Sequence, residues 1–188
     1  MTVYFENPGR QNTEQTAMLA IKKGKEQGIK YIVVASNTGH TANHFVGKGF
    51  STICVTHHVG FREKGCDEMN SETRQHLKAQ GVKLLTTTHL FGNVERAVTN
   101  KFGGLYPGGL ISETLRMLSQ GTKVAVEISI MALDAGLIPH GEPIIAVGGT
   151  GGGADSAVVI KPAHAKELFD TEILEIICKP RSSKKQVT

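Results

Sequence analysis

The sequence predicts an α/β protein, specifically a three-layer α/β/α sandwich with a mainly parallel sheet and an antiparallel edge strand. Short apolar runs rich in Val and Ile alternate along the chain with amphipathic segments, which is typical of parallel strands joined by helices. Two late apolar runs, residues 143–147 and 156–160, are instead joined by a glycine-rich segment without an evident helix. That short connection predicts an antiparallel hairpin at one edge of the sheet.

Each expected strand is an apolar, mainly β-branched run bounded by turn residues. The expected strands are residues 3–5, 31–35, 50–56, 82–86, 143–147, 156–160 and 173–178. The expected helices are residues 13–27, 38–48, 71–80, 111–119 and 122–135, with a further helical stretch from residue 94. Asn12 and Gln15 have the spacing of a capping box at the first helix, and Gly136 is a natural C-terminal cap for the last.

Length and composition predict one domain over residues 1–180, followed by a basic flexible tail over residues 181–188. The chain has 188 residues, of which 39% are hydrophobic and 20% are charged. It has no apolar run long enough for a membrane helix and no signal-peptide pattern, so a cytoplasmic location is expected. Cys54, Cys66 and Cys178 are widely spaced without a CxxC pair, as expected of a reduced protein.

The net charge of +4 does not predict a nucleic-acid partner. Four basic residues lie in the last ten positions, which contain no Asp or Glu, so the rest of the chain has a formal charge of zero. These residues are Lys179, Arg181, Lys184 and Lys185. Aromatic residues make up only 5% of the chain, which leaves few surfaces for base stacking. We therefore expect neither nucleic acid nor a membrane as a partner.

The turn after the strand at residues 31–35 is the main candidate for ligand binding. A buried strand opens here into a helix amino terminus, whose free N–H groups and dipole favour an anion. Short polar side chains add donors, and Gly39 would let a ligand approach the backbone closely. The candidate binding residues are Ser36, Asn37, Thr38, Gly39, His40 and Thr41. An ordinary helix N-cap in a β–α loop is the alternative.

The segment Tyr31-Ile-Val-Val-Ala-Ser-Asn-Thr-Gly-His-Thr-Ala42, followed by Ser51-Thr-Ile-Cys-Val-Thr56, resembles the carboxy-terminal α/β domain of pyruvate kinase. In that domain a similar turn holds a phosphate of an allosteric sugar phosphate. Residues 3–180 as a whole are similar to a family of stand-alone pyruvate-kinase-like α/β domain proteins. Further matching segments are Asn7-Pro-Gly9, Val55-Thr-His-His-Val-Gly-Phe61, Glu127-Ile-Ser-Ile-Met131, Ala146-Val-Gly-Gly149, Gly153-Ala-Asp155 and Lys161-Pro-Ala-His164. The resemblance implies flavin mononucleotide (FMN) as the ligand, and it does not extend to the catalytic barrel of pyruvate kinase.

The resemblance also implies that strands 31–35 and 143–147 lie side by side at the centre of the sheet. The turn at 36–41 and the glycine run at 148–153 would then flank one crevice, with Gly148, Gly149 and Thr150 forming its second wall.

Three or four phosphate contacts of about 1.5–3 kcal/mol each roughly offset the cost of association, estimated at about 4–15 kcal/mol. A flat apolar body would add affinity, which favours a flavin over a sugar phosphate. His40, where Arg or Lys is common, also disfavours the sugar phosphate.

Three histidines at expected strand ends offer a rival chemistry. His57 and His58 follow one strand and His89 follows the next, so all three are expected at the binding edge. With acidic residues of the following loop they could ligate a divalent metal; these are Glu63, Asp67 and Glu68. Adjacent strand residues point to opposite faces, and the chain has no H-E-x-x-H motif. We therefore place one of His57 or His58, and His89, near the ligand ring and predict no metal.

The remaining acidic residues are expected to have structural roles. Lys123, Glu127 and Asp134 fall on one stripe of an apolar helix and are expected at its solvated face. The alternative is that Glu127, in an apolar setting, carries a proton. Asp155 could accept a hydrogen bond from a ligand hydroxyl or simply begin a strand.

The sequence thus predicts a homo-oligomeric protein that binds a small phosphorylated ligand, FMN first of all, with a possible flavin-dependent redox role. One alternative is a non-enzymatic module that senses a sugar phosphate or nucleotide by changing its association. A metal-dependent hydrolase is the other.

Overall fold

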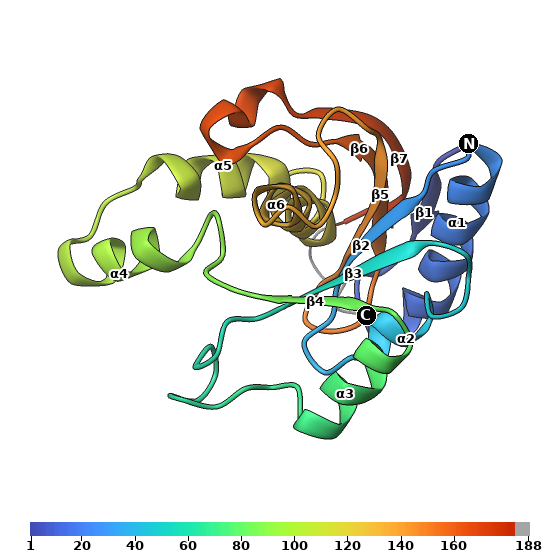
Figure 1. Ribbon diagram of the computed structural model, residues 1–188. Helices are drawn as coiled ribbons and strands as arrows, with labels where there is room; N and C mark the ends of the chain where they lie inside the picture. The colour runs from blue at the N-terminus through green and yellow to red at the C-terminus, as the bar shows by residue number, and fades with distance from the viewer. Residues whose placement is uncertain (183–188) are drawn as a thin grey trace.

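The protein is described by a computed structural model over residues 1–182, in which a seven-stranded sheet lies between two layers of helices (Figure 1). The strands are β1 (Val3–Phe5), β2 (Tyr31–Ala35), β3 (Ser51–Thr56), β4 (Lys83–Thr86), β5 (Ile144–Gly148), β6 (Ser156–Lys161) and β7 (Glu172–Pro180). Their order in the sheet is β1-β7-β6-β5-β2-β3-β4. β6 is antiparallel to β5 and β7, and the other neighbouring strands are parallel. The predicted fold class is confirmed, but the antiparallel strand β6 lies inside the sheet and not at its edge, because β7 and β1 continue the sheet beyond the β5–β6 hairpin.

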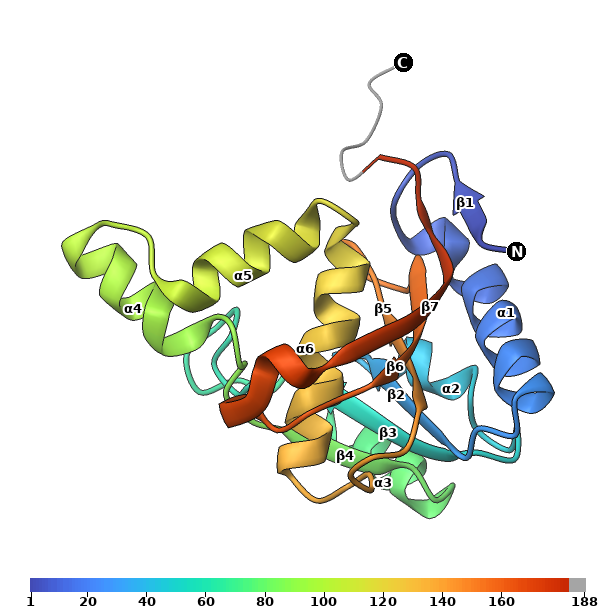
Figure 2. The same ribbon diagram turned by 90° about the horizontal axis from the view of Figure 1, so that it is seen from above.

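Helices cover both faces of the sheet. The helices are α1 (Thr13–Glu26), α2 (His40–Asn43), α3 (Ser71–Ala79), α4 (Asn93–Phe102), α5 (Pro107–Arg116) and α6 (Gln120–Asp134), with short 3-10 helices η1 (Arg10–Asn12) and η2 (Ala165–Asp170). Figures 1 and 2 show α1, α2 and α3 on one side and α6 on the other, with α4 and α5 reaching away from the sheet beyond α6. The three predicted layers are therefore present, and α4 with α5 forms an extension of one of them.

The core consists of two apolar clusters, one on each face of the sheet. In β2, Ile32 and Val34 face α1 and its neighbours, whereas Val33 faces α6. Alternating faces that are both apolar explain why the strand is a continuous hydrophobic run. The sequence therefore fits a central strand with helices on either side.

The structure contradicts part of the expectation that Lys123, Glu127 and Asp134 form a solvated stripe on α6. Lys123 and Glu127 are 7% and 4% exposed, whereas Asp134 is exposed at the end of the helix. α6 contacts four strands on one side and α5 and η2 on others, so most of its circumference is covered. The predicted solvated face was wrong for Lys123 and Glu127, because a second layer of helix lies outside α6.

Two helix ends also differ from the sequence expectation. α2 is a single turn that ends at Asn43, and the chain then turns back toward β3 through Gly47 and Gly49, whose φ values of 68° and 90° are left-handed. Asn12 belongs to η1 and makes no side-chain cap at α1. The cap predicted at Gly136 is confirmed by its φ of 68°.

Arg181, which was expected in the flexible tail, is instead bound to the edge of the sheet. The Arg181 N–H donates to the Phe5 carbonyl at 2.8 Å, and its guanidinium pairs with Glu6 at 2.9 Å, so this residue extends the β1–β7 edge. Residues 183–188, which include Lys184 and Lys185, lie outside the described residues. Within residues 1–182, no helix is both long and apolar enough to cross a membrane.

Candidate functional site

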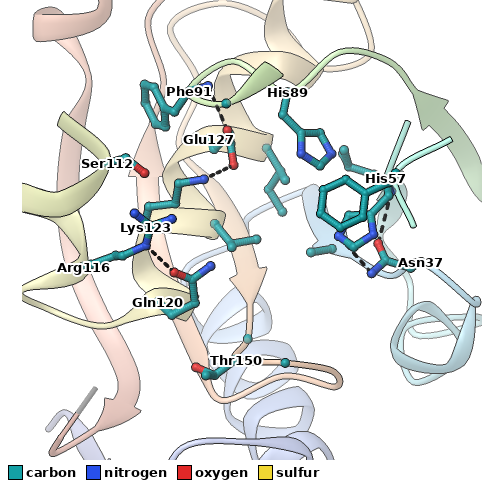
Figure 3. A pocket seen from close by; sticks show the side chains of 18 of the residues that line it. Asn37, His57, His89, Phe91, Ser112, Arg116, Gln120, Lys123, Glu127 and Thr150 are labelled. Atoms are coloured by element: carbon teal, nitrogen blue, oxygen red, sulfur yellow. Dashed lines mark hydrogen bonds and ion pairs between the residues drawn. The ribbon is translucent and has the colours of Figure 1, made fainter. Parts of the chain in front are cut away.

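A cavity of about 1080 Å³ opens at the carboxyl end of the central strands (Figure 3). β2 lies between β5 and β3, and both of these strands are parallel to it. The chain continues from β2 to β3 on one side and from β5 to β6 on the other side, so the loops that leave β2 and β5 diverge and a crevice forms between them. The turn at 36–41 and the loop at 149–153 both border this cavity, as expected. Sites for small molecules usually measure roughly 300–1,000 Å³, so the space suits a nucleotide-sized ligand with room for solvent.

Most of the predicted binding residues line this cavity. The nine that do are Ser36, Asn37, Thr38, His40, Thr41, His57, His89, Gly149 and Thr150. Gly39, Gly148 and His58 do not. The prediction that one of the two adjacent histidines faces the crevice agrees with this placement, and that histidine is His57.

Gly39 and Gly148 serve packing, contrary to the roles expected for them. A Cβ on Gly39 would lie 2.5 Å from Thr73 Cγ2 of α3, and its φ of 84° is left-handed. A Cβ on Gly148 would lie 2.3 Å from the Gly121 carbonyl oxygen of α6. These glycines allow the close approach of a helix, and not of a ligand.

In the turn at 36–41, part of the expected anion site is already occupied. Ser36 Oγ accepts hydrogen bonds from the N–H groups of Thr41 and Ala42 at 3.1 and 3.3 Å. The helix-cap alternative is therefore correct for Ser36. Within residues 1–182, the N–H groups of Thr38 and His40, which both line the cavity, have no acceptor, so the exposed part of the turn retains donors for an anion.

Arg10 supplies a positive charge to this turn that the sequence analysis did not identify. It belongs to η1 and lies against the glycine loop, since a Cβ on Gly153 would be 2.9 Å from Arg10 Cα. Partial burial, followed by the nearby charges of Arg10 and His44, lowers the pKa of His40 from its ordinary value. His40 is therefore neutral near pH 7, and Arg10 is the cation there. We call Arg10, the turn at 36–41 and the loop at 149–153 the turn wall.

Asp155 holds Arg10 in place indirectly. Its side chain is fully buried, and its carboxylate accepts from the Gly9 N–H at 2.9 Å and from the Ser156 hydroxyl at 2.9 Å. Of the two expected roles, the structural one is therefore observed. Asp155 anchors the segment that carries Arg10 to the start of β6.

His57 is fixed in one orientation by three partners. Asn37 Oδ1 accepts from the His57 backbone N–H at 3.1 Å, so the amide NH₂ of Asn37 faces His57 Nε2, also at 3.1 Å. An NH₂ group can only donate, so Nε2 accepts and the ring hydrogen is on Nδ1, which donates to Glu68 at 2.5 Å. The Phe61 ring stacks on His57 at a centroid distance of 3.6 Å. Together these residues present a flat aromatic surface at the cavity.

His89 lies next to this surface at the end of β4. Its ring is 5.4 Å from that of His57 and 5.6 Å from that of Phe61. Burial is the main cause that lowers its pKa, and the charge of Glu127 opposes the shift. His89 is therefore neutral near pH 7. Within residues 1–182, no group of three or more His, Cys, Asp or Glu side chains is arranged to hold a metal ion.

The opposite side of the cavity is formed by side chains of α5 and α6. Lys123 Nζ donates to Glu127 Oε2 at 2.5 Å, and Glu127 Oε1 accepts from the Phe91 N–H at 2.9 Å. Arg116 Nε donates to Gln120 at 2.6 Å (Figure 3). We call Arg116, Gln120, Lys123 and Glu127 the helix wall. The spacing of Lys123 and Glu127 in an apolar helix was visible in the sequence and was interpreted as a solvated face.

Comparison with known proteins identifies the family of the chain. Residues 14–160 match the family model described as pyruvate kinase, alpha/beta domain, so the chain belongs to this family. Among solved structures, a pyruvate kinase from Cryptosporidium parvum is 19% identical over 78% of this chain and 22% of that chain, with a TM-score of 0.40. The Cryptosporidium parvum pyruvate kinase in complex with ADP is 20% identical over the same shares, with a TM-score of 0.40. The chain thus spans less than a quarter of the length of these kinases.

Proposed function

We propose that this member of the pyruvate kinase alpha/beta domain family binds a phosphate-bearing ligand, FMN first of all, in the cavity at the carboxyl end of the sheet. One observation supports this above all others. The turn wall gathers unpartnered backbone donors and Arg10 beside the aromatic surface of His57 and Phe61 in a single cavity. An anion and a flat ring system are the two parts of FMN.

The phosphate end of the ligand would lie at the turn wall. The N–H groups of Thr38 and His40 and the Thr38 hydroxyl are donors, and within residues 1–182 Arg10 has no carboxylate partner. Hydrogen bonds to a charged group contribute about 1.5–3 kcal/mol each. Three or four of them roughly offset the cost of association. The phosphate would thus position the ligand, and its affinity would depend on the ring.

The ring end fits the aromatic side of the cavity. Phe61 is 44% exposed although it stacks on His57, so part of its surface is free to cover a ligand. Burying about 250 Å² of ring surface would contribute about 6 kcal/mol. Thr150 Oγ1 is buried at the cavity and has no hydrogen-bond partner among residues 1–182; a ligand hydroxyl would supply one. The residues present therefore fit FMN.

A bound flavin would supply redox chemistry, and the protein would hold and orient it. The proposed activity is accordingly that of a flavin-dependent oxidoreductase. A reducing cytoplasm and a homo-oligomeric state are the setting that we predict for it.

The test is to purify the native protein, record its visible absorption and identify any small molecule that acid releases. We expect a yellow protein that releases FMN in near-equal amount. Thr38→Glu places a carboxylate where the phosphate would lie, and we expect FMN to be lost. Thr88→Glu is the matched control, because Thr88 is exposed and lies outside the cavity lining. A colourless protein that does not bind added FMN, or a Thr38→Glu variant that retains it, would overturn the proposal.

Arg10 favours one second candidate. A sugar-phosphate ligand was disfavoured because position 40 is His and not Arg or Lys. Arg10 supplies that cation from another segment of the chain. A protein that binds sugar phosphates, fails to bind FMN and changes its association state on binding would be a sensor of the kind that the sequence analysis kept as an alternative.

A further inference from the structure

The buried ion pair of the helix wall has no role in the proposed phosphate site. Lys123 and Glu127 both line the cavity, yet their side chains are only 9% and 5% exposed. Figure 3 shows both extending from α6 toward the side where His89 lies. Both charges act on the pKa of His89, at the ring end of the cavity, so their position calls for a separate explanation.

The pair is not needed to fill space. Replacing a buried ion pair by apolar residues of similar volume is often neutral or stabilising, because both charges lose water on burial. The Phe91 ring lies 5.7 Å from Lys123 Nζ, so the pair borders apolar surface on that side. An apolar pair at these two positions would therefore serve the core at least as well.

The hydrogen bonds leave Lys123 with unused donors. Both oxygens of Glu127 are engaged, one by Lys123 and one by the Phe91 N–H, so the carboxylate is held rigidly. An ammonium group has three donors, and within residues 1–182 Lys123 uses one of them in a hydrogen bond. The arrangement holds a cation at the cavity with donors to spare.

We propose that Lys123 binds an electron-rich oxygen at the end of the ligand opposite its phosphate, and that Glu127 is the positioning residue for Lys123. This inference rests on the proposed function. In FMN the matching group is the pyrimidine end of the ring, which carries carbonyl oxygens and gains negative charge when the flavin is reduced. Lys123 then binds the reduced form more tightly than the oxidised form and raises the midpoint potential.

The test compares the wild-type protein with Lys123→Met/Glu127→Gln, which removes both charges and keeps an oxygen for the Phe91 N–H. Lys22→Met is the control, because the Lys22 side chain is 74% exposed on α1. The measurements are the Kd for FMN, the midpoint potential of bound FMN and the melting temperature without ligand. Lys123→Gln replaces the double variant if that one does not fold.

We expect the double variant to bind oxidised FMN at least tenfold more weakly and to melt at the same or a higher temperature. Its midpoint potential should fall by about 30 mV for each tenfold loss of preference for the reduced form. An unchanged Kd and potential with a lower melting temperature would show that the pair is structural and overturn the inference. If Thr38→Glu loses FMN while the double variant behaves as wild type, only this inference fails. If the wild-type protein does not bind FMN, both proposals fail.

Discussion

The two walls of the cavity are built in different ways. The turn wall is mostly main chain: amides of Thr38 and His40, a glycine loop, and Arg10 held by a neighbouring segment. The helix wall is made of long charged side chains that project from α5 and α6 and are tied to one another. A turn that follows a strand brings consecutive residues to the sheet edge, whereas a helix places residues four apart on one face, and other layers decide whether that face is buried. The first arrangement is visible in a sequence, and the second depends on packing.

The two walls also differ in what they contribute to binding. The turn wall carries a net positive charge from Arg10 and fits a dianion. In the helix wall Lys123 is balanced by Glu127, and Arg116 pairs with Glu113, so its charges compensate locally. Under the proposed function the turn wall would position the phosphate, and the helix wall would select what the phosphate is attached to.

The largest expected effect comes from moving the helix wall. Gly148→Ala would place a Cβ 2.3 Å from the Gly121 carbonyl oxygen, so α6 must shift away from β5. We expect the free energy of unfolding to fall by about 1–3 kcal/mol, as for other overpacked sites, measured by chemical denaturation. Gly92→Ala is the control, since its Cβ would meet nothing nearer than 3.8 Å. Equal losses in the two variants would show that Gly148 does not set the distance between α6 and the sheet.

A smaller effect should separate the two walls by ligand. Arg10→Gln removes the cation of the turn wall, and we expect the Kd for FMN to rise by about 10- to 100-fold, corresponding to one charged hydrogen bond. Riboflavin, which lacks the phosphate, should bind unchanged, and calorimetry with both ligands measures the difference. Arg181→Gln is the control, because Arg181 is tied to Glu6 at the β1 edge. A parallel loss for both ligands would place the phosphate elsewhere.

The smallest effect concerns His89, between the two walls. Burial lowers its pKa, so below the ordinary value of 6.5 the unfolded chain takes up a proton before the folded protein does. Stability should therefore fall as the pH drops through about 6.5, with a slope of at most about 1.4 kcal/mol per pH unit from this residue. In His89→Gln the melting temperature should depend less on pH between 8 and 5.5, with His40 still contributing in the same direction. An unchanged slope would contradict the burial of a neutral His89.

Much of the fold was predictable because it depends on local pattern. The seven strands lie close to their expected positions, since a strand covered on both faces must be apolar throughout. The convergence of residues 36–41 with the glycine loop followed from the family resemblance and the sheet order that it implies. The length of α2 was not predictable from periodicity, because after Asn43 the chain continues in tight turns, in which the N–H groups of Phe45 and Val46 donate to carbonyls three residues before them.

The predictions about the site that were wrong or incomplete all concern contacts between segments that are distant in the chain. Lys123 and Glu127 were placed in solvent because the pattern of α6 shows which residues are polar but not how many layers surround the helix. Arg10 was missed because it reaches the turn from another segment, across a contact with Gly153. Gly39 and Gly148 were assigned to a ligand because the need for a small residue looks the same whether a ligand or a helix approaches.

The sequence by itself determined the α/β architecture, the central strands and the polar turn at their carboxyl ends, since each of these depends on residues adjacent in the chain. Only the tertiary structure decided which charges are buried, which cation serves the turn and which glycines serve packing. Those properties depend on the free energy of contacts between distant segments, and a sequence pattern does not contain the distances between them.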